Sequence, residues 1–188
     1  MGRWPAGATE RLERAALELY QRRGFESTTV AEIAARAGLT ERTFFRHYAD
    51  KREVLFAGSA QLQELLVRAV TEADQSLSPL EAIISALMGA AAVFEERRAF
   101  VSQRQAIIAA NPELQERELI KLARLAGALA TALRQRGVPE PGATLAAEAG
   151  VAVFRVAFDR WSCPSGERPL AEMIRESAGQ LRQVASAS

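Results

Sequence analysis

The sequence predicts an all-α protein, with an N-terminal three-helix helix-turn-helix domain and a larger C-terminal helical domain. Alanine is abundant throughout the 188 residues, which raises helix propensity along the whole chain. Apolar residues recur at helical spacing, and glycine and proline separate the segments that carry this pattern. A hydrophobic fraction of 48% with 25% charged residues is typical of a folded chain. We expect the two domains to cover residues 1–50 and 51–188.

The N-terminal domain begins with a helix over residues 9–23, whose apolar positions lie on one face and which Gly24 ends. The stretch Thr29-Val-Ala-Glu32 is a capping box that begins a second helix, and Gly38 stops this helix after barely two turns. Thr40 can then cap a third short helix. Two short helices that are joined by a glycine turn and braced by a preceding helix predict a helix-turn-helix unit.

The third expected helix has two different faces. At 100° per residue, Phe44 and Tyr48 fall together toward the core, and Arg42, Thr43 and Arg46 fall roughly opposite. The two arginines could be merely a solvated face, but an anionic partner would offset the repulsion between like charges four residues apart. A helix that is anchored on one side and carries arginines on the other suits the major groove, where arginine reads guanine edges. We therefore expect double-stranded DNA as a partner.

Residues 9–57 resemble the DNA-binding domain of the TetR family of transcriptional regulators. The resemblance lies in Thr29-Val-Ala-Glu-Ile-Ala-Ala-Arg-Ala-Gly-Leu-Thr, in Thr43-Phe-Phe-Arg-His-Tyr and in Lys51, which opens the next helix. It implies a dimeric repressor that binds a palindromic operator through its third helix, with a ligand-binding helical domain behind it. It also implies that Thr29 and Lys51 contact phosphates from helix N-termini.

The family's DNA-facing positions can be carried onto this sequence one by one. They fall on Thr40, Thr43, Phe45, Arg46 and His47. Phe45 departs from the tyrosine that is common in the family, so a hydroxyl that could reach phosphate is missing. Arg42 stands where many members have a small residue, which makes it the first candidate for reading a base. His47 is the only histidine of the chain, which excludes a metal cluster built from histidines and favours a phosphate contact or local packing.

The C-terminal domain is expected to contain a series of longer helices. The second of them begins at the capping box Ser78-Pro-Leu-Glu81, is apolar on nearly all sides and should be the buried centre of the domain. The pattern predicts helices over residues 51–75, from 79 to 93 or 94, from Pro112 to Arg136, over 143–161 and over 169–184, with loops at 138–142 and 162–169. A further segment follows a break near Glu95 to Arg98 and ends at Asn111-Pro112.

The helix over residues 143–161 carries two apolar stripes, one aromatic and one of smaller aliphatic residues. A helix with two apolar faces needs two partners, so we expect this helix and the last one to form an isologous four-helix interface in a homodimer. The residues expected in the dimer interface are Leu145, Ala149, Ala152, Val153, Val156, Met173, Ile174 and Leu181.

The aromatic stripe has two interpretations, namely core packing or the lining of a ligand cavity. The family resemblance implies such a cavity, and large apolar side chains dominate the residues that could line it, so the expected effector is a small, largely apolar molecule. The residues expected to bind it are Phe94, Phe100, Arg104, Ile108, Phe154, Arg155 and Phe158.

Two other classes of function compete with a ligand-responsive regulator. One is a helical scaffold or interaction protein without DNA binding, and the other is an enzyme. With one histidine, one cysteine and no phosphate loop, an enzyme would depend on carboxylates, of which Glu148 and Asp159 are the best available. We expect no enzyme activity, metal or cofactor.

The sequence also shows no sign of targeting to or across a membrane. The first residues have no signal-peptide pattern, and no apolar run is long enough to span a membrane. Cys163 has no second cysteine with which to form an internal disulfide, and a reducing cytoplasm suits it.

Overall fold

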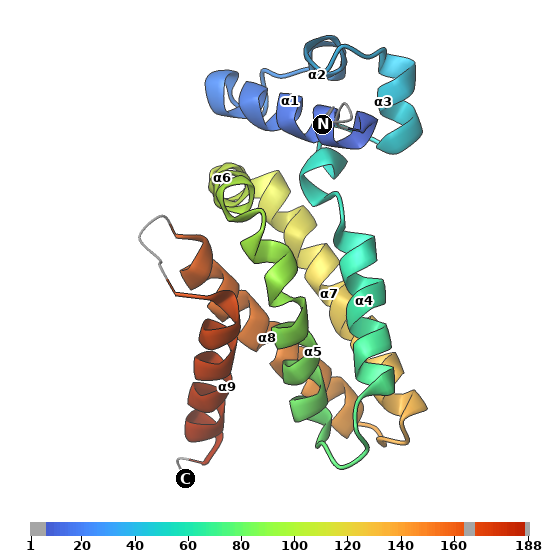
Figure 1. The fold of residues 1–188 in the computed structure, drawn as a ribbon, viewed down its shortest axis with the longest axis vertical. Helices are drawn as coiled ribbons and strands as arrows, with labels where there is room; N and C mark the ends of the chain where they lie inside the picture. The colour runs from blue at the N-terminus through green and yellow to red at the C-terminus, as the bar shows by residue number, and fades with distance from the viewer. Residues whose placement is uncertain (1–6, 164–167, 187–188) are drawn as a thin grey trace, which may run out of the picture. The chain divides into compact units, whose positions relative to one another are not determined.

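The computed structural model describes residues 7–163 and 168–186, and the regular structure of these residues is entirely helical (Figure 1). The all-α fold class is therefore confirmed. The elements are α1 (Ala8–Arg23), α2 (Val30–Arg36), α3 (Glu41–His47), the 3-10 helix η1 (Glu53–Phe56), α4 (Ser59–Glu72), α5 (Pro79–Glu95), α6 (Arg98–Ala109), α7 (Pro112–Gln135), α8 (Gly142–Ser162) and α9 (Leu170–Ser186). Residues 164–167, half of the loop that we expected at 162–169, lie outside the described residues, as do residues 1–6.

The chain folds into two compact units. The first unit runs to Gly58 and also includes Gln103–Glu116, and the second unit consists of Ser59–Ser102 and of the chain from Arg117 onward. The separation in the structure thus falls eight residues later than the expected boundary after residue 50. The end of α6 and the start of α7 also belong to the first unit, although both helices continue in the second.

The long helix that we expected over residues 51–75 is interrupted. The Asp50 carboxylate accepts hydrogen bonds from the backbone N–H groups of Arg52 (2.8 Å) and Glu53 (3.2 Å), and only the short helix η1 follows. Gly58 then adopts φ = +83°, a left-handed conformation that glycine adopts without steric cost. The chain therefore turns at Gly58 before α4 begins at Ser59.

The first unit is held together by a core between its short helices. Helix α1 packs against α2 and η1, and α2 packs against α3. Four of the most completely buried large side chains of the protein lie here, namely Leu12, Phe25, Ile33 and Phe44. At about 25 cal/mol per Å² of buried apolar surface, these side chains anchor helices that are too short to be stable alone.

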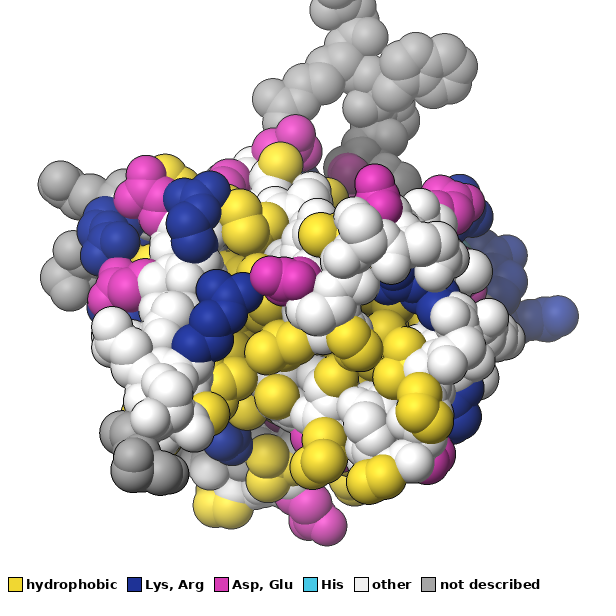
Figure 2. Space-filling model, turned by 90° about the horizontal axis from the view of Figure 1, so that it is seen from below, with side chains coloured by type: hydrophobic (Ala, Val, Ile, Leu, Met, Phe, Trp, Pro, Cys, Tyr) yellow, Lys and Arg dark blue, Asp and Glu magenta, His cyan; other side chains and the backbone are white. Residues whose placement is uncertain are grey.

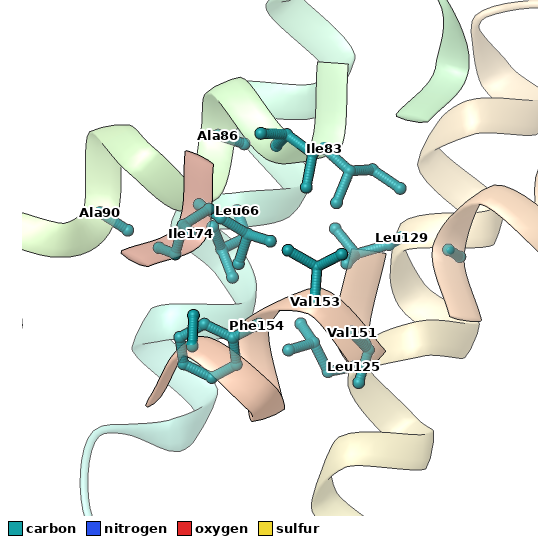
Figure 3. Close-up of a cluster of buried hydrophobic side chains, with 14 of the residues drawn as sticks. Leu66, Ile83, Ala86, Ala90, Leu125, Leu129, Val151, Val153, Phe154 and Ile174 are labelled. Atoms are coloured by element: carbon teal, nitrogen blue, oxygen red, sulfur yellow. The ribbon is translucent and has the colours of Figure 1, made fainter. Parts of the chain in front are cut away.

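The second unit is centred on α5, which packs against α4, α8 and α9. The helix begins with the predicted capping box, in which the Ser78 hydroxyl donates to the Glu81 carboxylate at 2.6 Å. Figure 3 shows how side chains from α4, α5, α7, α8 and α9 converge in its core. Helix α5 is thus the buried centre of the unit, as its apolar pattern predicted.

A glycine allows α5 and α8 to approach closely. A Cβ atom added to Gly150 on α8 would lie 2.5 Å from Cγ2 of Ile83 on α5. Ile83 is fully buried, so its side chain has little room to move aside. Gly150 is therefore required by packing and not by backbone conformation.

We predict that Gly150→Ala destabilises the protein by about 1–3 kcal/mol because it overpacks the contact with Ile83. Gly89→Ala is the matched control, because Gly89 also lies inside a helix but has open space around its Cα, so that this change should stabilise by about 0.5–1 kcal/mol. Urea unfolding followed by circular dichroism, at one protein concentration, measures both changes. Stabilisation by both variants would contradict the proposed close approach.

Candidate nucleic-acid interface and effector cluster

The start of α2 is fixed by a reciprocal capping box. The Thr29 hydroxyl accepts a hydrogen bond from the backbone N–H of Glu32 at 3.2 Å, and the Glu32 carboxylate accepts from the backbone N–H of Thr29 at 2.9 Å. The Thr29 hydroxyl also donates to this carboxylate at 3.0 Å, and the hydrogen bonds from the Thr29 backbone N–H and hydroxyl lower the pKa of Glu32. Arg23, at the end of α1, forms an ion pair with the same carboxylate. The polar groups of Thr29 thus cap the start of α2, and the ion pair between Arg23 and Glu32 joins α2 to α1.

Helix α3 begins at Thr40 as the sequence predicted. The Thr40 hydroxyl accepts a hydrogen bond from the backbone N–H of Thr43 at 3.2 Å, and the two hydroxyl groups lie 3.0 Å apart. The helix ends after His47, because Tyr48 has an extended backbone (φ −136°, ψ 139°). These ends limit α3 to seven residues.

Two aromatic side chains attach α3 to the core of the first unit. Phe44 is completely buried and Tyr48 is 7% exposed, and their ring centroids lie 5.6 Å apart. The Tyr48 hydroxyl also points toward the Glu13 carboxylate on α1, with 3.5 Å between the oxygens. One face of α3 is therefore fixed to α1.

The remaining surface of α3 is open to solvent. Arg42, Arg46 and His47 are exposed, and Phe45 exposes 54% of its surface with its ring set edge-on against Phe44. Within the described part of the chain, neither Arg42 nor Arg46 takes part in an ion pair or hydrogen bond, so both guanidinium groups are available to a ligand. The structure thus gives α3 the two faces that its periodicity predicted.

Lys51 differs from these exposed residues, because its ammonium group already has partners in the protein. Its Nζ donates hydrogen bonds to the backbone carbonyls of Phe25 (2.9 Å), Glu26 (3.1 Å) and Thr28 (3.1 Å). It also lies 4.4 Å from the centroid of the Phe25 ring. The sequence offered no signal for these contacts, since Lys51 and its partners are more than twenty residues apart.

In the second unit, three of the residues expected to bind an effector form an aromatic cluster. Phe94 of α5 lies 5.8 Å from Phe154 and 5.3 Å from Phe158 of α8, measured between ring centroids. Trp161 completes the cluster at 5.6 Å from Phe158 and is completely buried. Phe94 is the least buried of the four. We call Phe94, Phe154, Phe158 and Trp161 the aromatic cluster.

A carboxylate joins three helix ends beside the aromatic cluster. Oε1 of Glu95, at the end of α5, accepts hydrogen bonds from the indole N–H of Trp161 at 3.0 Å and from the backbone N–H of Leu170 at 2.6 Å. Arg98 donates to the carbonyl of Trp161 at 2.9 Å and lies over its ring. These polar contacts fix the ends of α5 and α8 and the start of α9 around the aromatic rings.

The other residues expected to bind an effector lie elsewhere. Arg104 and Ile108 belong to the first unit, where Arg104 donates to the carbonyl of Leu55 and Ile108 is buried. Phe100 packs beneath the Arg97 guanidinium, and Arg155 is exposed. Phe100, Arg104 and Ile108 all lie on α6, and the helical period within α6 does not show which residues outside this helix each of them contacts.

Comparison with known proteins identifies both parts of the chain. Residues 13–57 match the family described as bacterial regulatory proteins of the tetR family, and residues 77–186, more than half of the chain, match the MftR C-terminal domain. The chain belongs to the TetR family. The resemblance that the helix-turn-helix sequence indicated is thereby confirmed.

Individual members of the TetR family cover this chain to different extents. The HTH-type transcriptional regulator TcmR of Streptomyces glaucescens is 38% identical over 77 residues, which make up 41% of this chain and 34% of TcmR. The mycofactocin biosynthesis transcriptional regulator MftR of Mycobacterium tuberculosis is 30% identical over 119 residues, or 61% of this chain and 58% of MftR. The chain thus matches less than two thirds of the length of either relative.

A solved structure of a TetR-family repressor matches nearly the whole chain. This is FadR of Thermus thermophilus in complex with lauroyl-CoA, which is 27% identical, covers 93% of each chain and superposes with a TM-score of 0.56. The similarity extends over both units, each of which therefore has the fold of this family.

The residues that we expected in a dimer interface of this TetR-family chain divide into two groups. Val153, Met173 and Ile174 are buried in the chain's own core, and Figure 3 shows Val153 surrounded by core side chains. Their assignment to the interface is therefore corrected. The exposed or partly exposed residues of the expected interface are Leu145, Ala149, Ala152 and Val156 on α8 and Leu181 on α9. Figure 2 shows that hydrophobic side chains gather across the middle of the face seen from below.

Glu148 and Asp159, the two carboxylates considered for catalysis, lie on α8. Burial raises the pKa of Asp159, while Glu148 is exposed. The described residues contain no group of three or more histidine, cysteine or acidic side chains that could hold a metal ion. Among these same residues, no helix is both long and apolar enough to cross a membrane.

Proposed function

We propose that this chain is a ligand-responsive transcriptional repressor that binds a palindromic operator as a homodimer. The observation that carries the proposal is the division of α3 into a buried aromatic face and an exposed face with two unpaired arginines. Membership of the TetR family supports it, because the family consists of bacterial regulatory proteins. A helical scaffold without DNA binding is the competing function, and it does not account for two exposed like charges on one short helix.

The proposed role of α3 is to enter the major groove of DNA. Burial of Phe44 and Tyr48 fixes its orientation, so its exposed side chains can contact bases without a large loss of backbone freedom. Arg42 lies in the first turn of α3, where side chains of a recognition helix reach base edges. We assign base reading to Arg42, with Thr43, Phe45, Arg46 and His47 as further contacts along the helix. Thr29 and Thr40 mark the helix starts that would face phosphates.

We predict that Arg42→Ala weakens operator binding by about 1–3 kcal/mol and relaxes the preference at one base pair of each half-site. Arg22→Ala is the control, because Arg22 is an exposed arginine on α1 that is paired with Glu18. The probe is a duplex that the protein selects from a random pool, compared with a scrambled duplex by fluorescence anisotropy. If Arg42→Ala loses equal affinity for both duplexes, Arg42 contacts phosphate and not a base.

Dimerisation is assigned to α8 and α9. The exposed positions 145, 149, 152 and 156 follow one another at intervals of four, three and four residues, which places them on one stripe of α8. Leu145 exposes 65% and Val156 44% of its surface, and together with Ala149 and Ala152 they form one apolar stripe, a grouping that is typical of an interaction site. A second copy of the same stripe would provide an isologous partner.

We predict that Val156→Glu weakens dimerisation on the order of 100-fold, because it buries a charge without a partner in the interface. Thr131→Glu adds the same charge at an exposed position of α7 and should leave the dimer intact. Sedimentation velocity over a concentration series measures the effect. A Val156→Glu protein that stays dimeric at the same concentrations as the wild type would remove α8 from the interface.

The effector is assigned to the neighbourhood of the aromatic cluster. The four aromatic rings together offer a large apolar surface. Part of this surface is accessible, because Phe94 is only partly buried. FadR, at 27% identity over nearly the whole chain, was solved in complex with lauroyl-CoA. We therefore propose a substantially apolar effector, with an acyl chain as the first candidate.

We predict that lauroyl-CoA raises the melting temperature of the protein, because a ligand that binds only the folded state stabilises it. Phe158→Leu should weaken binding by about threefold to tenfold through loss of aromatic contacts. Phe100→Leu is the control, because Phe100 lies against Arg97 and outside the cluster. Differential scanning fluorimetry over a ligand series measures all three proteins. An unchanged melting temperature in the wild type would remove acyl-CoA from the proposal.

A further inference from the structure

Lys51 joins two segments of the first unit that are distant in sequence. It lies between α3 and η1, and its ammonium group donates to three carbonyls of the connection between α1 and α2. The three N···O distances lie between 2.9 and 3.1 Å, so each of the three ammonium protons has an acceptor at ordinary hydrogen-bond length.

The backbone of Lys51 is held from the other side. The Tyr20 hydroxyl of α1 donates a hydrogen bond to the carbonyl of Lys51 at 2.6 Å. Burial raises the pKa of Tyr20, which keeps this hydroxyl protonated and able to donate. The Phe25 ring, which lies under the ammonium group, also packs edge-on against Tyr20 at 5.1 Å. Lys51 is thus tied by its backbone to α1 and by its side chain to the connection that follows α1.

The last of the three carbonyls belongs to Thr28, which directly precedes the N-cap of α2. At the beginning of the connection, the Gly24 N–H donates to the Tyr20 carbonyl of α1 (3.0 Å). The connection also contains the backbone hydrogen bond from Thr28 to Phe25 (3.3 Å) and the bond from the Thr28 hydroxyl to the Gly24 carbonyl (2.8 Å). Both of these bonds lie within the connection itself. The hydrogen bonds of Lys51 therefore tie the segment before α2 to the segment that follows α3, in addition to the packing of α2 against α1 and α3.

We propose that Lys51 is a positioning residue that fixes α2 against the segment after α3, and that it supports DNA binding through this geometry and not through a phosphate contact. The DNA-binding part rests on the proposed function. A compact ammonium group suits three converging carbonyls, whereas the planar guanidinium of arginine donates in a fork. Arginine is, however, a good phosphate ligand. The two roles of Lys51 therefore predict opposite outcomes for Lys51→Arg.

The free protein provides the first test, because the chain has only two lysines, Lys51 and Lys121. Both are acylated with an N-hydroxysuccinimide ester and followed by peptide mass spectrometry in the native and the urea-unfolded protein. We expect the native state to protect Lys51 about tenfold or more, and the selected duplex to add no further protection. Native Lys51 that reacts as fast as in urea, and becomes protected only when the duplex is added, would overturn the proposal. The acylation of Lys121, which lies in the second unit, is followed in the same samples for comparison.

The second test measures operator affinity over a salt series for Lys51→Met and Lys51→Arg. We expect both variants to bind the selected duplex about tenfold or more weakly than the wild type. Affinities are measured at a temperature where circular dichroism shows that the variants are folded. The slope of the logarithm of the binding constant against the logarithm of the salt concentration should equal that of the wild type. Arg22→Gln, which removes an exposed charge of the same unit, should match the wild type in affinity. Wild-type affinity of Lys51→Arg, together with a slope for Lys51→Met that is lower by about 0.9 per contact, would show a phosphate contact and refute the positioning role.

The two tests separate this inference from the proposed function. If the protein selects no duplex from the random pool, the proposed function fails, while the protection of Lys51 in the free protein still decides whether its ammonium group is held by the connection. If a duplex is selected and Lys51→Met binds it as tightly as the wild type, the proposed function stands and the role of Lys51 in it fails.

Discussion

The burial of Phe44 is the interaction on which the proposed DNA-binding surface depends. Helix α3 has only seven residues, too few for a stable helix in water, so its existence requires tertiary packing of one face. Phe44 is completely buried and supplies that packing, with Tyr48 beside it. Because these rings fix the rotation of the helix, Arg42 and Arg46 are left on its open surface. The same constraint explains the polar caps at Thr29 and Thr40, since short helices have many unpaired end groups relative to their length.

Features of the fold that arise from neighbouring residues could be predicted from the sequence. The capping boxes at Thr29 and Ser78 form as expected, because each requires only two side chains three residues apart. The two faces of α3 likewise follow from the helical period. The interruption at Gly58 was missed because the apolar period continues across it in Val54, Leu55 and Leu62, and because glycine is also tolerated inside helices. Only the left-handed backbone of Gly58 distinguishes a turn from a continuous helix.

Contacts between distant segments could not be predicted from the sequence. A helical wheel shows that Val153 is apolar, but not whether its own chain or a partner covers it, and the structure places it in the core. Lys51 shows the same limitation for a charged side chain. Its position at a helix start suggested phosphate, whereas its three carbonyl partners lie 23 to 26 residues away in sequence. Arg104 was grouped with aromatic residues of the second unit, although its carbonyl partner, that of Leu55, lies in the first.

The division of α6 between the two units bears on how an effector could influence DNA binding. Residues 98–102 of this helix belong to the second unit and residues 103–109 to the first, so one continuous hydrogen-bonded helix connects them. Arg98 in its first turn contacts Trp161 of the aromatic cluster, and Arg104, less than two turns later, donates to the carbonyl of Leu55 in η1. Because η1 begins two residues after Lys51, α6 carries contacts both to the proposed effector site and to the segment that follows Lys51.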